Sequence, residues 1–152
     1  MNGRYWILPF KEVEDAKNLI EKGMFALGDK SWAAPGGSRQ LKKGDKVCFY
    51  LVGKGVVAHG TVKTDPCYYT EDRELFQRMK GEEGDNYDEK RYPWMFTMED
   101  VHVYLDNPVE IDYTRRLQME SFKSEGSRKR WGWFVHRDRE ITGHEFDLLT
   151  SR

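Results

Sequence analysis

A β-hairpin is predicted by the stretch LKKGDKVCFYLVGKGVVAHGTV, residues 41–62. Residues 46–52 form a nearly continuous apolar run, which is typical of a strand covered on both faces. Gly53 and Gly55 can reverse the chain, because glycine adopts the backbone conformations that tight turns need. Residues 56–62 then return as the partner strand. The sequence therefore places an antiparallel pair of strands near the middle of the fold.

The segment before the hairpin predicts a strand, a helix and a loop. Residues 5–10 (YWILPF) form a short apolar run that ends beside a proline, as strands often do. Residues 13–20 carry apolar side chains at helical spacing, and Gly23 is placed to end that helix. Residues 24–40 are rich in glycine, alanine, serine and proline and lack a sustained period, so we expect a structured loop.

The segment after the hairpin predicts a helix and a long strand. Thr70 can cap a helix over residues 71–80, whose first turn is acidic and suits the helix dipole. Residues 94–104 alternate between apolar and polar side chains, which indicates a strand, with a bulge expected at residues 99–100.

A capping box predicts the last helix. Thr142 and Glu145 have the required spacing, and Ile141 can pack onto Phe146 as a hydrophobic staple. The order of elements favours an α+β class, with a curved five- to six-stranded sheet or β-barrel and helices packed around it. Because 152 residues is an ordinary domain size, we expect a single domain over residues 1–152.

Composition limits the classes of protein. The chain has 25 basic and 26 acidic residues, so no global attraction to polyanions is expected and any nucleic-acid surface must be local. No stretch approaches the roughly 18 apolar residues of a membrane span, and Cys48 and Cys67 lack disulfide or metal-site spacing. We therefore expect a cytoplasmic protein with no membrane partner, acting as a monomer.

Motifs for catalysis, metals and cofactors are missing from the sequence. No GxSxG, catalytic-cysteine, HExxH, paired CxxC or P-loop pattern occurs. His136, Asp138 and His144 come nearest to a metal-binding cluster, but scattered surface residues explain them better. We expect no catalytic residue, no metal and no cofactor.

Aromatic residues beside basic ones are the remaining signal. Rings stack on nucleic-acid bases, at roughly 1–3 kcal/mol each, while lysine and arginine neutralise phosphates. Trp32 lies in the small-residue loop KSWAAPGGS, which offers few neighbours to bury it, so a binding wall is at least as well supported as core packing. Trp131, which follows a basic run, can equally pack in the core or contact a ligand. The candidate phosphate contacts are Lys30, Arg39, Arg128, Lys129 and Arg130.

The order of these motifs resembles the EVE domain of the PUA-like superfamily and, more distantly, the YTH domain. The likeness rests on RYWILP (residues 4–9), the loop tryptophan, the hairpin, YPWMFTME (residues 92–99) and RKRWGWF (residues 128–134). It implies a β-barrel whose aromatic pocket accepts a flipped-out, modified base of DNA or RNA.

The resemblance also implies roles for individual residues. Trp32 becomes the main aromatic wall, and Ala33 and Ala34 offer backbone groups to the base edge. The opposite wall of the pocket is assigned less directly, because Pro9 and Phe10 stand where YTH domains have a polar pair. The second aromatic ring is assigned only by its position in the sequence. The remaining candidate lining residues are Pro9, Phe10, Lys11, Tyr68, Tyr69 and Trp131.

Three functions are left open by the sequence. The first is a non-enzymatic reader of a methylated or hydroxymethylated base, acting alone or within a larger restriction or RNA-processing assembly. The second is an enzyme that acts on a modified nucleoside or small base-like substrate in the same pocket. The third is an RNA-binding module without preference for modification.

Overall fold

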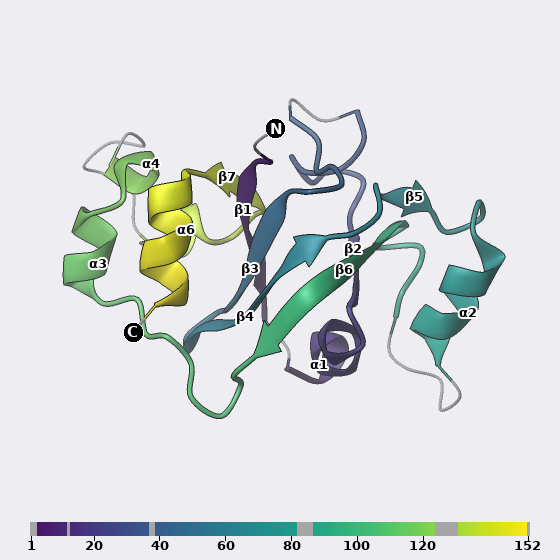
Figure 1. The fold of residues 1–152 in the computed structure, drawn as a ribbon, viewed down its shortest axis with the longest axis horizontal. Helices are drawn as coiled ribbons and strands as arrows, with labels where there is room; N and C mark the ends of the chain where they lie inside the picture. The colour runs from purple at the N-terminus through teal and green to yellow at the C-terminus, as the bar shows by residue number, and fades with distance from the viewer. Residues whose placement is uncertain (1–2, 12, 37–38, 82–86, 124–130, 152) are drawn as a thin grey trace.

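The computed structural model describes residues 3–11, 13–36, 39–81, 87–123 and 131–151. These residues form one curved sheet with helices on both of its faces (Figure 1). The strands are β1 (Tyr5–Phe10), β2 (Met24–Leu27), β3 (Lys46–Leu51), β4 (Gly55–Val62), β5 (Cys67–Tyr68), β6 (Trp94–Val103) and β7 (Arg139–Ile141). The helices are α1 (Val13–Glu21), α2 (Arg73–Lys80), α3 (Tyr113–Leu117), α4 (Glu120–Lys123), α5 (Trp131–Phe134) and α6 (Gly143–Thr150).

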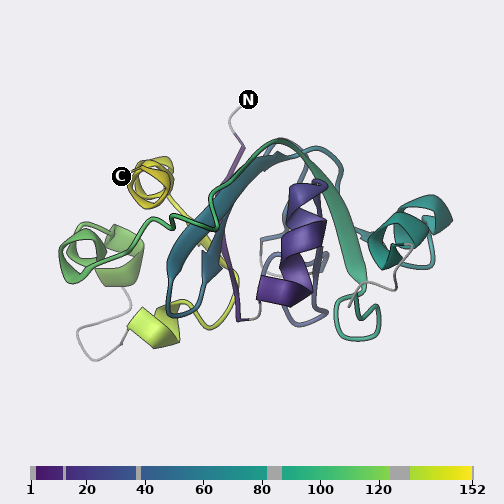
Figure 2. The same ribbon diagram turned by 90° about the horizontal axis from the view of Figure 1, so that it is seen from below.

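The sheet runs in the order β2-β6-β4-β3-β1-β7, with the two-residue β5 added beside β6. Strand β1 pairs in parallel with β3, and the other pairs are antiparallel. The sheet bends into an open arch, with α1 in its hollow and α6 outside it (Figure 2). The predicted α+β class and curved sheet are confirmed, and the main path has six strands, the upper end of the predicted range.

Apolar side chains form a separate core on each side of the arch. The inner core holds alternate residues of β1, such as Trp6 and Leu8, together with Ala33 and Ala34 from the loop after β2. The outer core packs Ile7 against α5 and α6. Because successive side chains of a strand point to opposite faces, β1 contributes to both cores. A third cluster joins α1 and α2 across β2 and β6.

The predicted hairpin and its neighbours fold for the reasons read from the sequence. Gly55 has a φ of 132°, and a Cβ there would lie 2.3 Å from the Val109 carbonyl oxygen, so only glycine fits. The predicted bulge is present, because β6 places Asp100 and Val101 opposite a single residue of β4 and Asp100 has a φ of 52°. The capping box of Thr142 is also confirmed.

Two local predictions were wrong. Residues 24–27 were expected in a loop, but they form β2, because four apolar residues find a partner in β6 far along the chain. Helix α2 begins at Arg73 and is capped by Asp72, whose side chain accepts a hydrogen bond from the Leu75 amide, rather than by Thr70.

Candidate functional site

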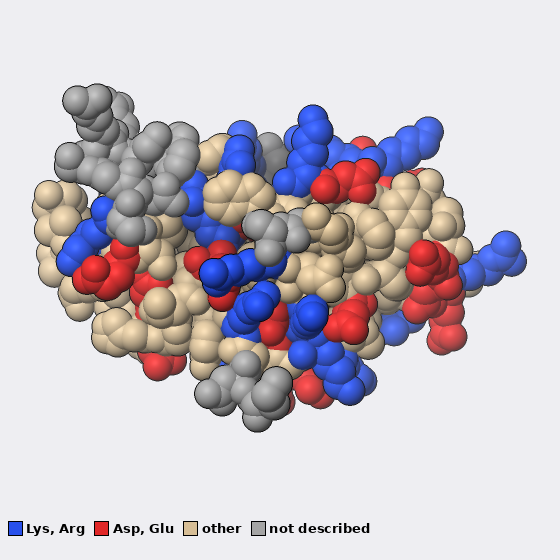
Figure 3. Space-filling view, turned by 90° about the horizontal axis from the view of Figure 1, so that it is seen from above, with Lys and Arg blue, Asp and Glu red and all other residues tan. Residues whose placement is uncertain are grey.

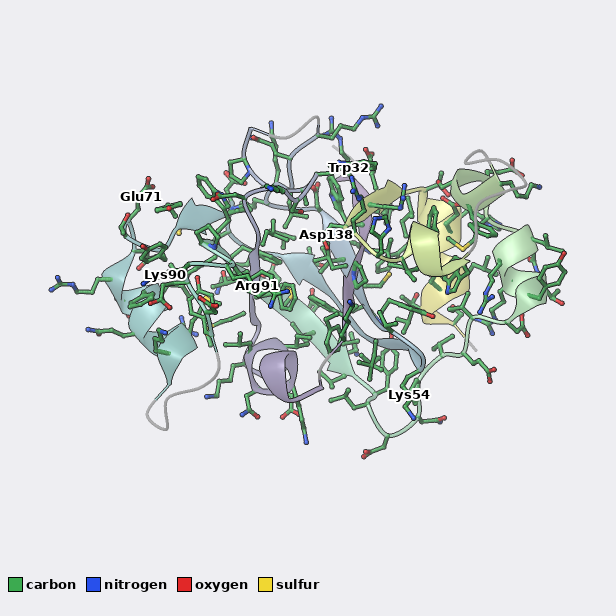
Figure 4. All side chains as sticks on the ribbon, turned by 180° about the vertical axis from the view of Figure 1, so that it is seen from behind. Trp32, Lys54, Glu71, Lys90, Arg91 and Asp138 are labelled. Carbon is green, nitrogen blue, oxygen red and sulfur yellow. The ribbon has the colours of Figure 1, made fainter. Side chains whose placement is uncertain are left out.

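Trp32 lies on a turn that is fixed from beneath. Its side chain is 40% exposed, whereas Ala33 and Ala34, which follow it, are fully buried in the inner core. The turn is closed by a hydrogen bond from the Ala34 amide to the Ser31 carbonyl (3.1 Å), and the Leu41 amide donates to the Ala33 carbonyl (2.7 Å). The alanines therefore anchor the loop while the indole stays at the surface (Figure 4).

Two arginines, one just before the last strand and one at its start, lie against the indole. The guanidinium carbons of Arg137 and Arg139 are 4.9 Å and 5.2 Å from the centre of the Trp32 ring. Arg139 is buried, contacts the Phe134 ring at 4.8 Å, and donates to the Phe134 carbonyl oxygen at 2.5 Å. Arg137 is exposed. Cation–π contact thus holds the indole against the start of β7 and places an exposed positive charge beside it.

Asp138 lies between these arginines in sequence and directly precedes β7. Its side chain reaches back to the loop that carries Trp32. Its Oδ2 accepts a hydrogen bond from the Ser31 hydroxyl at 2.5 Å, and Ser31 is the neighbour of Trp32 (Figure 4). The residue as a whole is half-buried, yet desolvation of its carboxyl raises the pKa to about 6, opposed in part by the Ser31 hydrogen bond.

We expect Asp138→Asn to raise the free energy of unfolding near pH 7 by about 1–3 kcal/mol, since one pKa unit corresponds to about 1.4 kcal/mol. Because desolvation places the folded-state pKa, about 6, above the ordinary 3.8, the folded protein binds more protons between these values. The parent protein therefore gains stability as the pH falls through about 6, and the advantage of the variant shrinks. Denaturant unfolding of both proteins near pH 7 and pH 4 measures the difference.

Asp147→Asn is the matched control, because Asp147 is exposed on α6 and undergoes the same change in charge. It should leave the stability unchanged at both pH values. An advantage of Asp138→Asn that is equally large near pH 4 would contradict a desolvated carboxylate as its cause.

No family model and no curated protein matches the chain by sequence. Solved structures match it by fold. A YTH domain-containing protein in complex with RNA has a TM-score of 0.58 at 12% identity, covering 98% of this chain and 78% of that one. The chain has a PUA-like fold. A hypothetical protein from Leishmania major has a TM-score of 0.53 at 16% identity, covering 95% and 90%. The N-terminal domain of Thermococcus gammatolerans McrB, bound to m5C DNA, has a TM-score of 0.50 at 9% identity, covering 97% and 95%.

Within this PUA-like fold, Trp131 packs in the core. The sequence had allowed either core packing or contact with a ligand. It is 7% exposed in the outer core, stacks on Phe134 at 5.4 Å, and donates from its indole nitrogen to the Tyr50 hydroxyl at 2.9 Å. Arg139 contacts both Phe134 and Trp32, so these groups separate the two indoles. The aromatic neighbours of Trp131 explain its burial.

The other candidate rings are those of Tyr68 and Tyr69, and Trp94 lies between Tyr68 and the loop that carries Trp32. The Tyr68 ring is 5.1 Å from the Trp94 ring, and the Trp94 indole nitrogen donates to Asp29 at 2.8 Å, on the loop that carries Trp32. Tyr69 packs instead on Phe76 at the third cluster. Tyr68 is therefore linked to the Trp32 loop through Trp94, and it stays a prediction as the second ring.

The backbone of the two alanines is largely occupied. The Ala33 amide donates to the Ser31 hydroxyl oxygen at 3.1 Å, and the Ala33 carbonyl and the Ala34 amide are bonded within the loop. Their predicted contact with the base edge would therefore require these bonds to open. The Ser31 side chain, which the sequence did not single out, lies beside them and contacts Asp138, which the sequence analysis considered only as part of a weak metal-binding pattern. Their contact joins residues 107 positions apart, so no local spacing could reveal it.

The end of β1 lies near the same core. Pro9 and Phe10 are half-buried, and Phe10 packs against the inner core that holds Ala33 and Ala34. Lys11 is exposed. These positions are compatible with the predicted opposite wall, which stays a prediction.

Basic side chains gather on the face seen from above, where the loop after β2 and the start of β7 lie (Figure 3). Lys30 is exposed, and Arg39 is 65% exposed while pairing with Glu140 at 2.7 Å. The predicted phosphate contacts Arg128, Lys129 and Arg130 lie outside the described residues. Exposed Arg137 adds a cation that the sequence analysis had not included.

Among the residues that the structure describes, no group of three or more histidine, cysteine, aspartate or glutamate side chains is arranged to hold a metal ion. Over the same ranges, no helix has both the length and the apolar surface that crossing a bilayer requires.

Proposed function

We propose that this PUA-like chain is an EVE-type reader, which binds DNA or RNA and holds one flipped-out, methylated or hydroxymethylated base against Trp32. The observation that carries the proposal is the exposed indole on a turn whose next two residues are fully buried. A rigid support lets a ring stack on a base without first losing its own freedom, so less of the stacking free energy is spent on ordering the loop.

The charges around the indole suit the same ligand. Arg137 and Arg39 are exposed cations on the face that carries Trp32, while Asp138 is a polar group beside the ring. Flipping a base costs a few kcal/mol of stacking and pairing, which stacking on Trp32 and hydrogen bonds to the base edge must offset. Methylation enlarges the apolar surface that a ring can cover.

Two of the solved structures that share the fold support the proposal by their ligands. One is a complex of a YTH domain-containing protein with RNA, and the other is a McrB N-terminal domain bound to m5C DNA. At identities of 12% and 9% the likeness itself extends to the fold alone, so the ligand of this chain rests on its own side chains.

A binding panel tests the proposal. Fluorescence anisotropy at fixed salt would compare short RNA and DNA strands and duplexes that differ only in one central base, which is plain, 5-methylated, 5-hydroxymethylated or N6-methylated. We expect at least one modified strand to bind about fivefold or more tighter than its plain counterpart, the ratio that corresponds to about 1 kcal/mol.

The same panel separates the other functions. Equal affinity for all strands would contradict the reader and favour an RNA- or DNA-binding module without preference for modification. Chromatography of modified nucleosides incubated with the protein tests for turnover, and product formation would favour the enzyme. Absence of binding to every strand would refute the proposal.

A further inference from the structure

Ser31 and Asp138 form a hydrogen-bonded pair beside Trp32, and stacking of a base on the indole gives this pair no role. Ser31 donates its hydroxyl hydrogen to Asp138 Oδ2 and accepts from the Ala33 amide at 3.1 Å. Since an ionised carboxylate can only accept hydrogen bonds, the serine hydroxyl is the donor to the carboxyl. This is the carboxyl's only hydrogen bond within the described residues, so Oδ1 has no partner among them.

The pair also lies where the edge of a stacked base would be. Ser31 and Trp32 are consecutive, and the arginines on both sides of Asp138 contact the Trp32 ring. The carboxyl is joined through the Ser31 hydroxyl to the amide of buried Ala33. A base stacked on the indole thus has the carboxyl beside it, and covering an acceptor without giving it a donor is costly.

We propose that Asp138 recognises the edge of the bound base and selects bases that carry an exocyclic amino group over those that carry a keto group in its place. This inference rests on the proposed function. An ionised carboxylate only accepts hydrogen bonds, and aspartate accepts from the N4 amino group of cytosine in nucleic-acid complexes. A keto oxygen at the same position places two acceptors against each other, so both lose their partners.

Ser31 acts on the base through Asp138. Its hydrogen bond to Oδ2 helps to fix the orientation of the carboxyl plane and leaves Oδ1 to accept from the ligand. Ser31 is therefore a positioning residue. By orienting the carboxyl, Ser31 contributes to the selectivity for amino-bearing over keto-bearing bases.

The test uses two oligonucleotides that differ only in containing 5-methylcytosine or thymine at one position. The two bases have the same ring and the same 5-methyl group, but one has a 4-amino and the other a 4-keto group. We expect the parent protein to bind the 5-methylcytosine strand about tenfold or more tighter, because a buried acceptor without a donor is costly. For Asp138→Asn, whose amide offers both a donor and an acceptor, we expect the preference to fall within about twofold or to reverse.

Asp147→Asn serves as the control, because it changes the charge equally on α6, outside the arch. It should keep the parent's preference. Thermal unfolding of Asp138→Asn confirms that the variant is folded, and the Ser31→Ala variant should show an intermediate preference.

The outcomes separate the two proposals. If the parent protein binds neither strand, or if removing the Trp32 ring does not weaken binding, the proposed function fails. If binding depends on Trp32 but the parent does not distinguish the two bases, or Asp138→Asn distinguishes them as well as the parent, the role of Asp138 is refuted and the reader function stands.

Discussion

Trp32→Ala is expected to weaken binding of a modified-base oligonucleotide by about 5- to 150-fold, the ratio that corresponds to the loss of roughly 1–3 kcal/mol of stacking. The same change should lower the free energy of unfolding by only about 1–2 kcal/mol, because the indole loses its cation–π contacts with Arg137 and Arg139 while the buried alanines still anchor the turn. Anisotropy titrations and thermal unfolding of the same preparations measure both quantities.

Trp32→Phe is the matched variant, since it keeps a ring of smaller area at the same place. We expect it to retain most of the affinity, with a loss of a fewfold. An alanine variant that binds the modified strand as tightly as the parent would show that the base stacks elsewhere.

Asp45→Ala is expected to lower the free energy of unfolding by about 2–4 kcal/mol, because it leaves one buried and two partly buried donors without an acceptor. The Asp45 carboxylate is 4% exposed and accepts from the Arg4 amide at 2.9 Å, the Trp6 indole nitrogen at 3.0 Å and the Lys42 amide at 2.9 Å. It therefore joins the start of β1 to the turn before β3. Denaturant unfolding monitored by circular dichroism gives the difference.

A second aspartate on the same side of the fold provides the control. Asp65 accepts from the Lys43 amide at 2.7 Å, but this hydrogen bond is exposed and water can replace it. Asp65→Ala should therefore cost less than about 1 kcal/mol. Equal losses for the two variants would contradict burial as the origin of the large effect at Asp45.

Local sequence signals predicted the parts of the fold that local interactions stabilise. The hairpin and the capping box at Thr142 depend on residues close together in sequence, and both are confirmed. Strand β2 was missed because its four residues carry no period of their own and are ordered by β6, which begins at Trp94. The sequence thus predicts elements better than it predicts which short segments join the sheet.

At the site, too, local features could be predicted from the sequence and tertiary contacts could not. The exposure expected for Trp32 follows from its small neighbours, whereas the burial of Trp131 depends on Tyr50 and Phe134, whose contacts are tertiary. The sequence around a tryptophan that lies beside basic residues does not distinguish a buried ring from an exposed one. The Ser31–Asp138 contact spans 107 positions and involves two common residue types, so only the pairing of β1 with β7 reveals it.

That pairing also determines when the site can form. Residues Tyr5–Ile7 are hydrogen-bonded to Arg139–Ile141, so the first and last strands of the chain are neighbours at one edge of the sheet. Closing so long a loop is entropically costly and slow compared with forming the central hairpin, and we expect the three-residue edge strand to open locally before the centre of the sheet. The carboxyl of Asp138 reaches Ser31 only while that edge is closed. A bound base would therefore slow amide exchange in β7 first, linking occupancy of the pocket to the order of the chain's final strand.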